Sequence, residues 1–159
     1  MYSPNVSSRQ GMPIRLIVVH GDAGRSDEGT VSWILNPKSR VSYHYLVGRQ
    51  GTVTQLVRDE DKAWHAGKST WPACSHLGSV NHMSLGVAFA NDGTGGEEYG
   101  EAQLKAGADL VARLCHKYEL SPTYDVARHS DVSPGRKTDP WSWFPWDWFI
   151  EDIDGRVVV

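Results

Sequence analysis

Two histidines and one aspartate occupy positions from which they can bind a metal ion together. His20 directly follows the run 14–19, which is apolar except for Arg15 and whose β-branched residues predict a buried central strand. His129 follows a second short apolar run, and Asp139 lies ten residues further on, in a loop with proline and glycine. Because strand ends of one sheet can meet at one edge, these side chains can lie close together. Spacing alone also allows a simpler interpretation, in which both are loop histidines at strand ends.

The chemistry of this set would be hydrolytic. Two imidazoles and one carboxylate leave the fourth position of a tetrahedral Zn²⁺ open, which is typical of catalytic rather than structural zinc sites. Such an ion lowers the pKa of its bound water to about 7 and polarises a carbonyl group. Asp22 and Asp131 are alternative ligands, because each lies two residues from one of the histidines. Either can instead orient an imidazole through its second nitrogen.

Hydrophobic patterning predicts the elements that must position these residues. Ser26 is a candidate cap for a short helix that ends at Asn36-Pro37. The segment 99–118 carries apolar residues on one helical face and predicts the longest helix. Pro145 is expected to open a short helix in the Trp-rich tail. Further strands are predicted over 43–47, 52–57, 84–90 and 125–128. This order predicts an α/β (mixed α+β) fold, with a central mixed β-sheet flanked by helices.

Length and charge narrow the possible functions. A chain of 159 residues is typical of one domain, which we place at 14–159 as a single catalytic domain after a polar N-terminal lead-in, 1–13. The formal charge of −3 leaves no broad basic field, so nucleic acid is not expected as a partner. The longest apolar runs are too short for the roughly 20 residues of a membrane span, and 1–13 lacks a secretory signal. Cys74 and Cys115 are expected to be free thiols.

Seven short motifs occur in an order that resembles the type 2 N-acetylmuramoyl-L-alanine amidases. This superfamily includes the amidase-type phage endolysins and the peptidoglycan recognition proteins. The resemblance covers about residues 14–150, and its most specific parts are Trp64-His65-Ala66-Gly67 and the segment from His129 to Asp139. The motifs are Val18-Val19-His20, Tyr43-His44-Tyr45-Leu46-Val47, Gly51-Thr52-Val53, Ala63-Trp64-His65-Ala66-Gly67, Ser84-Leu85-Gly86-Val87, Arg128-His129 and Lys137-Thr138-Asp139-Pro140.

The resemblance implies Zn²⁺ held by His20, His129 and Asp139, and cleavage of the amide between the lactyl group of muramic acid and L-alanine. Lys137 falls at the position of a catalytic lysine, whose ammonium would stabilise the oxyanion of the tetrahedral intermediate. The alternative for Lys137 is a solvated loop lysine. Tyr43 matches a tyrosine of the phage branch whose hydroxyl can hydrogen-bond the attacking water, and a half-buried strand tyrosine is an equal alternative.

The resemblance also bears on the residues that contact substrate and on the general base. His65 is expected to line the substrate groove, the alternative being a loop histidine bonded to the backbone, and Trp71 is expected to contact substrate from the long loop 60–82. Many bacterial members carry a glutamate general base where this chain has Ala88, which can move no proton. Metal-activated water supported by Tyr43 and Lys137 is the expected replacement.

The combined expectation is a compact, monomeric, zinc-dependent endolysin whose partner is peptidoglycan and its muropeptides. By the same resemblance, it would remain in the host cytoplasm until released to the cell wall, without inserting into a membrane. Three alternatives stay open: a non-catalytic peptidoglycan-binding recognition module, a regulatory interaction protein with this fold, and a zinc hydrolase of small amides. The complete ligand set argues against the first, and the groove-type loop 60–82 argues mildly against the third.

Overall fold

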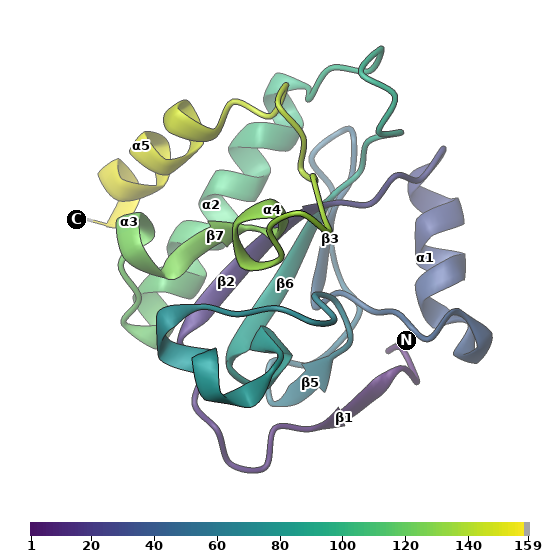
Figure 1. Ribbon diagram of the computed structural model, residues 1–159. Coiled ribbons are helices and arrows are strands. Elements are labelled where there is room, and N and C mark those ends of the chain that lie inside the picture. The colour runs from purple at the N-terminus through teal and green to yellow at the C-terminus, as the bar shows by residue number, and fades with distance from the viewer. Residues whose placement is uncertain (158–159) are drawn as a thin grey trace.

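A five-stranded mixed β-sheet forms the centre of the molecule, in a computed structural model that describes residues 1–157 (Figure 1). The strand order is β4–β3–β6–β2–β7, and only the pair of β3 with the edge strand β4 is antiparallel. Helices cover the sheet on both sides, which confirms the predicted fold class. The strands are β2 (Leu16–Gly21), β3 (Tyr45–Val47), β4 (Val53–Gln55), β6 (Ser84–Phe89) and β7 (Val126–Arg128).

The central strand β2 decides which face of the sheet carries the site. All six of its residues are buried, as expected for a parallel strand covered on both faces. Ile17 and Val19 pack into the main core, whereas Leu16 and Val18 pack into a second cluster on the other face. Because side chains alternate along a strand, His20 points to the same face as Leu16 and Val18.

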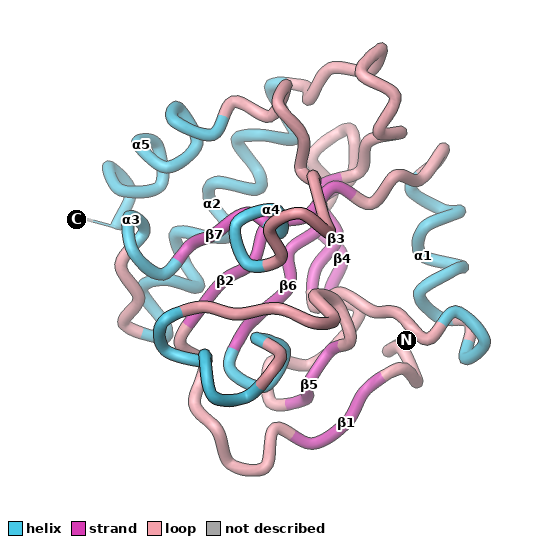
Figure 2. Tube along the Cα trace, viewed as in Figure 1, coloured by secondary structure: helices cyan, strands magenta, loops and turns pink. Residues whose placement is uncertain are grey.

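The main core lies between the sheet and two helices, α2 (Glu101–Tyr118) and α5 (Trp146–Val157), which pack on each other (Figure 2). The long helix agrees with the prediction for 99–118, and α5 begins directly after Pro145, as expected. Gly107 of α2 lies against Phe89 of β6 at a distance that leaves no room for a side chain. A Cβ atom at position 107 would lie 2.2 Å from Cζ of Phe89.

Gly107→Ala is therefore expected to destabilise the fold, although alanine is the better helix former. Overpacking of this kind costs about 1–3 kcal/mol, against a helix-propensity gain of about 1 kcal/mol. Gly155→Ala in α5 is the matched control, because a Cβ there meets nothing within 4 Å, and it should stabilise. Urea unfolding midpoints of both variants test this, and a Gly107→Ala protein at least as stable as the parent would contradict it.

The opposite face of the sheet is covered by α1 (Asp27–Leu35) and by the segment 64–83. Ser26 caps α1 by accepting a hydrogen bond from the Gly29 amide, as predicted. The segment 60–82 was predicted as a long loop, yet it contains β5 (Asp61–Ala63) and the 3-10 helices η2 (Pro72–Leu77) and η3 (Val80–Met83). Short elements of this kind lack the periodicity on which the prediction depends.

The N-terminal residues are part of the fold, which corrects the prediction of a lead-in over 1–13. Strand β1 (Val6–Ser8) pairs antiparallel with β5. The buried Asn5 amide donates to the backbone carbonyls of Ile34 and Asn36, close to the end of α1. The buried Arg9 guanidinium donates to the Asp59 and Ser84 carbonyls. In these contacts polar side chains donate hydrogen bonds to backbone carbonyls. Hydrophobic patterning does not predict contacts of this kind.

The remaining elements are short: η1 (Pro37–Ser39), α3 (Pro122–Asp125) and α4 (His129–Val132). Cys74 and Cys115 are both buried and free, as predicted. None of the described helices, α2 included, combines the length and apolar character needed to span a bilayer.

Candidate functional site

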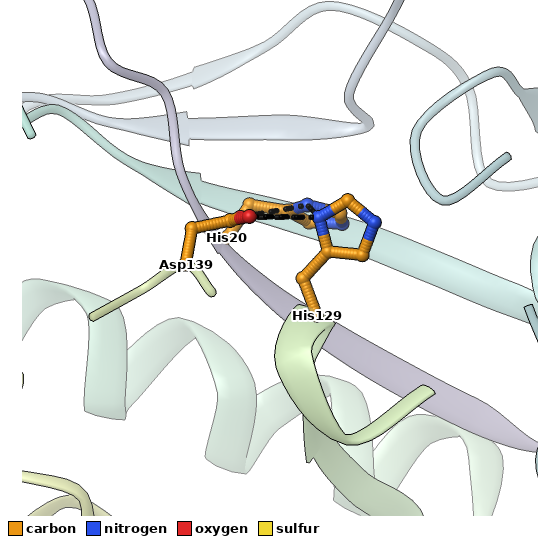
Figure 3. A group of neighbouring side chains, drawn as sticks. All are labelled: His20, His129 and Asp139. Carbon is orange, nitrogen blue, oxygen red and sulfur yellow. Dashed lines mark hydrogen bonds and ion pairs between the residues drawn. The ribbon is translucent and has the colours of Figure 1, made fainter. Parts of the chain in front are cut away.

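His20, His129 and Asp139 meet at one edge of the sheet, as the sequence predicted (Figure 3). His20 is the second-to-last residue of β2, His129 begins α4 directly after β7, and Asp139 lies in the loop before α5. The Nδ1 atoms of the two histidines are 3.1 Å apart. Oδ2 of Asp139 lies 3.2 Å from Nδ1 of His129 and 3.4 Å from Nδ1 of His20. Three potential ligand atoms therefore face a common point.

These distances fit a tetrahedral metal ion. Ligands bound about 2.0–2.2 Å from zinc at tetrahedral angles lie roughly 3.3–3.6 Å from each other. The observed separations of 3.1–3.4 Å need only a small expansion to reach that range. The three residues are nearly enclosed by protein, because each is less than 10% exposed. The donor set and its geometry can thus hold one metal ion and leave a fourth position for water or substrate.

The charge state of the group also suits a cation. Burial lowers the pKa of the His20 imidazole to about 4, so this ring is neutral and its lone pair is available near neutral pH. Burial opposes ionisation of Asp139, but hydrogen bonds with His129 and His20 outweigh it and hold the pKa of this carboxyl well below its usual range. A neutral imidazole and an ionised carboxylate are the forms that bind metal ions.

A second set of contacts orients the two imidazoles through their other nitrogens. Nε2 of His20 lies 2.9 Å from Nδ1 of His65, and Nε2 of His65 lies 3.0 Å from Oγ of Ser84. Nε2 of His129 lies 3.2 Å from the Ala66 carbonyl. With Nδ1 bound to a metal, His20 must carry its proton on Nε2 and donate it to His65. Such outer contacts fix the tautomer and the ring orientation of metal-binding histidines.

The place of His65 differs from the prediction. It was expected to line the substrate groove, but its ring is buried beneath His20, with the two ring planes at 90°. Gly86 of β6 makes room for it, because a Cβ at this position would lie 2.5 Å from Cγ of His65. We therefore assign His65 to the orientation of His20 and not to contact with substrate.

Trp71, which was expected to contact substrate, precedes η2 and is partly buried. It packs against the buried cluster that includes Leu16 and Cys74, so it helps to close its loop onto the core. Its contact with substrate stays a prediction.

The two residues predicted to assist catalysis lie near the metal-ligand group. The Tyr43 ring is half-buried, with its centre 5.1 Å from that of His20. Burial, together with the charges of Asp139 and Asp22, raises the pKa of Tyr43 above its usual value, so its hydroxyl keeps its proton. Lys137 is exposed in the loop that carries Asp139, and its positive charge contributes to the lowered pKa of His20. Their roles in catalysis stay predictions.

Other positions singled out in the sequence take structural places. Ala88 is the register partner of His20 on β6 and is fully buried, so an apolar methyl stands beside the metal-ligand group. Asp22 accepts hydrogen bonds from Thr30 and from the Asn91 amide, and Asp131 pairs with Arg128. Sequence reasoning missed Ser84 and the Ala66 carbonyl, since neither carries a signal at the level of residue type.

Comparisons with a family model and with curated proteins point to the same family. The family model described as N-acetylmuramoyl-L-alanine amidase matches residues 10–142. The amidase AmiD of Escherichia coli is 33% identical over 147 residues, which are 84% of this chain and 51% of AmiD. The 1,6-anhydro-N-acetylmuramyl-L-alanine amidase AmpD of Haemophilus influenzae is 30% identical, over 72% of this chain and 59% of AmpD. The chain thus spans about half the length of the curated relatives it matches.

Solved structures agree in fold. A crystal structure of an AmpD derivative has a TM-score of 0.78 at 26% identity, covering 96% of this chain and 92% of that one. The E. coli AmiD structure is a complex with anhydro-N-acetylmuramic acid-L-Ala-D-γ-Glu-L-Lys. It has a TM-score of 0.76 at 27% identity, and the match covers 92% of this chain and 60% of the AmiD chain. An endolysin from Clostridium intestinale, at 20% identity and a TM-score of 0.74 over 97% and 91% of the two chains, shares the fold.

Proposed function

The chain belongs to the N-acetylmuramoyl-L-alanine amidase family, and on this premise we propose that it is a zinc-dependent peptidoglycan amidase. The bond cleaved would be the amide between the lactyl group of N-acetylmuramic acid and L-alanine of the stem peptide. The observation that carries the proposal is the group of His20, His129 and Asp139, whose three ligand atoms lie at separations that fit a tetrahedral ion. An intact ligand set is what hydrolysis requires and what binding alone does not.

Each neighbouring side chain then has a defined task. When bound, Zn²⁺ supplies an acidified water and polarises the scissile carbonyl. His20, His129 and Asp139 would hold the ion, while His65 and the Ala66 carbonyl keep both imidazoles in the tautomer that exposes Nδ1. The Lys137 ammonium would stabilise negative charge on the carbonyl oxygen, and the Tyr43 hydroxyl would donate a hydrogen bond to the same region. Ala88 takes no part in proton transfer.

His65→Ala is expected to weaken zinc binding by about 10- to 100-fold, because the Nε2 proton of His20 loses its acceptor. His65→Gln, which restores an acceptor oxygen, should recover part of that loss. Zinc affinity is measured by competition with a chromophoric chelator, with circular dichroism as the check on folding. His76→Ala, which changes an exposed histidine of the same segment, is the control. A folded His65→Ala protein with the parent's zinc affinity would refute this role.

The activity itself is tested on purified, insoluble peptidoglycan. The zinc-loaded protein should release peptides with a free L-alanine amino terminus, detected by mass spectrometry, and the same protein after treatment with a chelator should release none. Restoring one equivalent of Zn²⁺ should restore release. Muropeptide that binds to the zinc-loaded protein but is never cut would contradict the proposal and indicate a recognition module.

We extend the proposal to the biological role, that of a monomeric endolysin held in the host cytoplasm until it reaches the wall. Support for this extension comes from the resemblance to phage endolysins and from the shared fold. Expression in the cytoplasm of a bacterial host should leave cells intact until the inner membrane is permeabilised, after which culture turbidity should fall. Cells that stay turbid after permeabilisation, while purified wall is digested, would argue against this role.

A further inference from the structure

A cavity of about 370 Å³ opens between the start of α1 and the segment that precedes β3. One wall consists of the loop 22–26 and of Thr30, Trp33 and Ile34 on α1, and the other includes Val41 and Tyr43. The volume falls within the range of about 300–1,000 Å³ that is typical of small-molecule sites. Apolar and aromatic surface combined with a few polar groups is also typical of such sites.

The cavity adjoins the metal-ligand group. Tyr43 forms part of its wall, and the same ring lies 5.1 Å from His20, centre to centre. Asp22, a second wall residue, follows His20 along the chain by two positions. Tyr43 is therefore shared between the cavity wall and the surroundings of His20.

Trp33 is the most unusual residue of this cavity. Its side chain is 55% exposed on α1, although an indole buries a large apolar area when it packs against the protein. Trp141 and Trp143, by contrast, stack on each other against the main core. A flat aromatic surface next to hydrogen-bonding side chains suits a pyranose ring, whose C–H groups form an apolar face and whose hydroxyls lie on its rim. Arg25 and Ser26 are exposed at the same cavity.

The two cavities beside the metal-ligand group differ in the charge of their lining residues, and this difference matches the two halves of the proposed substrate. Asp22 and Arg25 are the charged residues among those lining the Trp33 cavity, and their formal charges cancel. A second cavity, of about 530 Å³, lies beside α4 on the His129 side of the group. Its charged lining residues are Lys68 and Arg136, both cationic. An uncharged sugar suits the first cavity, whereas the carboxylates of a stem peptide suit the second.

We propose that the Trp33 cavity is a saccharide subsite, in which the indole of Trp33 stacks on a sugar ring of the glycan strand. The stem peptide of the same bound substrate then extends toward the cavity beside α4. This inference rests on the proposed amidase function, since it orients that substrate across the metal-ligand group. It adds a binding residue, Trp33, that takes no part in the hydrolytic step.

The test combines binding with kinetics. The disaccharide N-acetylglucosaminyl-N-acetylmuramic acid, without peptide, is titrated into ¹⁵N-labelled protein, and the indole N–H signal of Trp33 should shift. Two substrates are then compared: a disaccharide muropeptide, and a lactyl-peptide that lacks both sugars. Trp33→Ala should lower kcat/KM about tenfold for the muropeptide and leave the lactyl-peptide unaffected. Trp33→Phe should lower kcat/KM for the muropeptide less than Trp33→Ala does. Trp148→Ala is the control, because Trp148 is 40% exposed on α5, at the flank of the sheet away from α1 (Figure 1).

The possible outcomes are distinguishable. An active parent protein whose kcat/KM for the muropeptide is unchanged by Trp33→Ala overturns the subsite and leaves the amidase intact. A parent protein that cleaves neither substrate overturns the amidase proposal, and the disaccharide titration then decides the subsite separately. An unshifted Trp33 signal at saturating disaccharide would count against the subsite in either case.

Discussion

Replacing His129 with alanine is expected to abolish release of L-alanyl peptides from peptidoglycan, with a fall in rate of more than about a thousandfold. A metal ion contributes several kcal/mol of transition-state stabilisation to a hydrolysis, and each 1.4 kcal/mol corresponds to a factor of ten. Nδ1 of His129 lies within 3.2 Å of both other ligand atoms. Its removal leaves one imidazole and one carboxylate, which is too few to retain the ion firmly.

The measurement pairs activity with zinc content by atomic emission. His129→Ala should lose both together while keeping the parent's circular dichroism spectrum. His116→Ala serves as the control, because it removes an exposed histidine in the last turn of α2, far along the chain from the site. A His129→Ala protein that keeps stoichiometric zinc and full activity would show that the metal lies elsewhere or is not needed.

Replacing Lys137 with alanine should separate catalysis from metal binding. We expect kcat to fall by about 10²- to 10³-fold, the usual cost of removing one group that stabilises an oxyanion. Zinc affinity and thermal stability should stay at the parent's values, because the Lys137 side chain is exposed and is not among the ligands. Lys137→Arg keeps a positive charge with a different shape, so its kcat should lie between those of the parent and of Lys137→Ala.

Steady-state kinetics on a soluble muropeptide, together with chelator competition, measure both quantities. Lys38→Ala, which removes an exposed lysine of η1, is the matched control and should change neither. Unchanged kcat in Lys137→Ala would assign Lys137 to solvent and leave Tyr43 as the nearest group for the oxyanion. A large loss of zinc in the same variant would mean that Lys137 acts on the ligands and not on the substrate.

The metal-ligand group was predictable because its residues follow strands that hydrophobic patterning identifies. Residues 16–19, directly before His20, are all buried in β2, and β7 pairs parallel to it, so the ends of both strands meet at one edge. Position alone made Asp139 one candidate among the nearby aspartates, and the resemblance selected it, since no periodicity leads from His129 to a particular loop carboxylate. The long helix α2 was equally clear, because one of its faces is apolar over five turns.

The surroundings of the group were not predictable from the same signals. His65 lies behind His20 because Gly86, on another strand, leaves room for its ring, and that pairing depends on tertiary packing alone. Trp71 closes a segment onto the second cluster, which local sequence does not distinguish from contact with substrate. The N-terminal residues are held by side-chain bonds from Asn5 and Arg9 to backbone more than 25 positions away. Polar contacts over such separations leave no periodic pattern.

The central claim is that this group hydrolyses one particular amide bond, and isotope incorporation tests it most directly. Peptidoglycan is digested by the zinc-loaded protein in H₂¹⁸O, and the products are analysed by tandem mass spectrometry. We predict one ¹⁸O atom in the lactyl carboxylate of muramic acid and none in the released peptide, whose new terminus is the amine of L-alanine. Label in a peptide carboxylate would mean cleavage within the stem and would contradict the account. Unlabelled, undigested wall would contradict it equally.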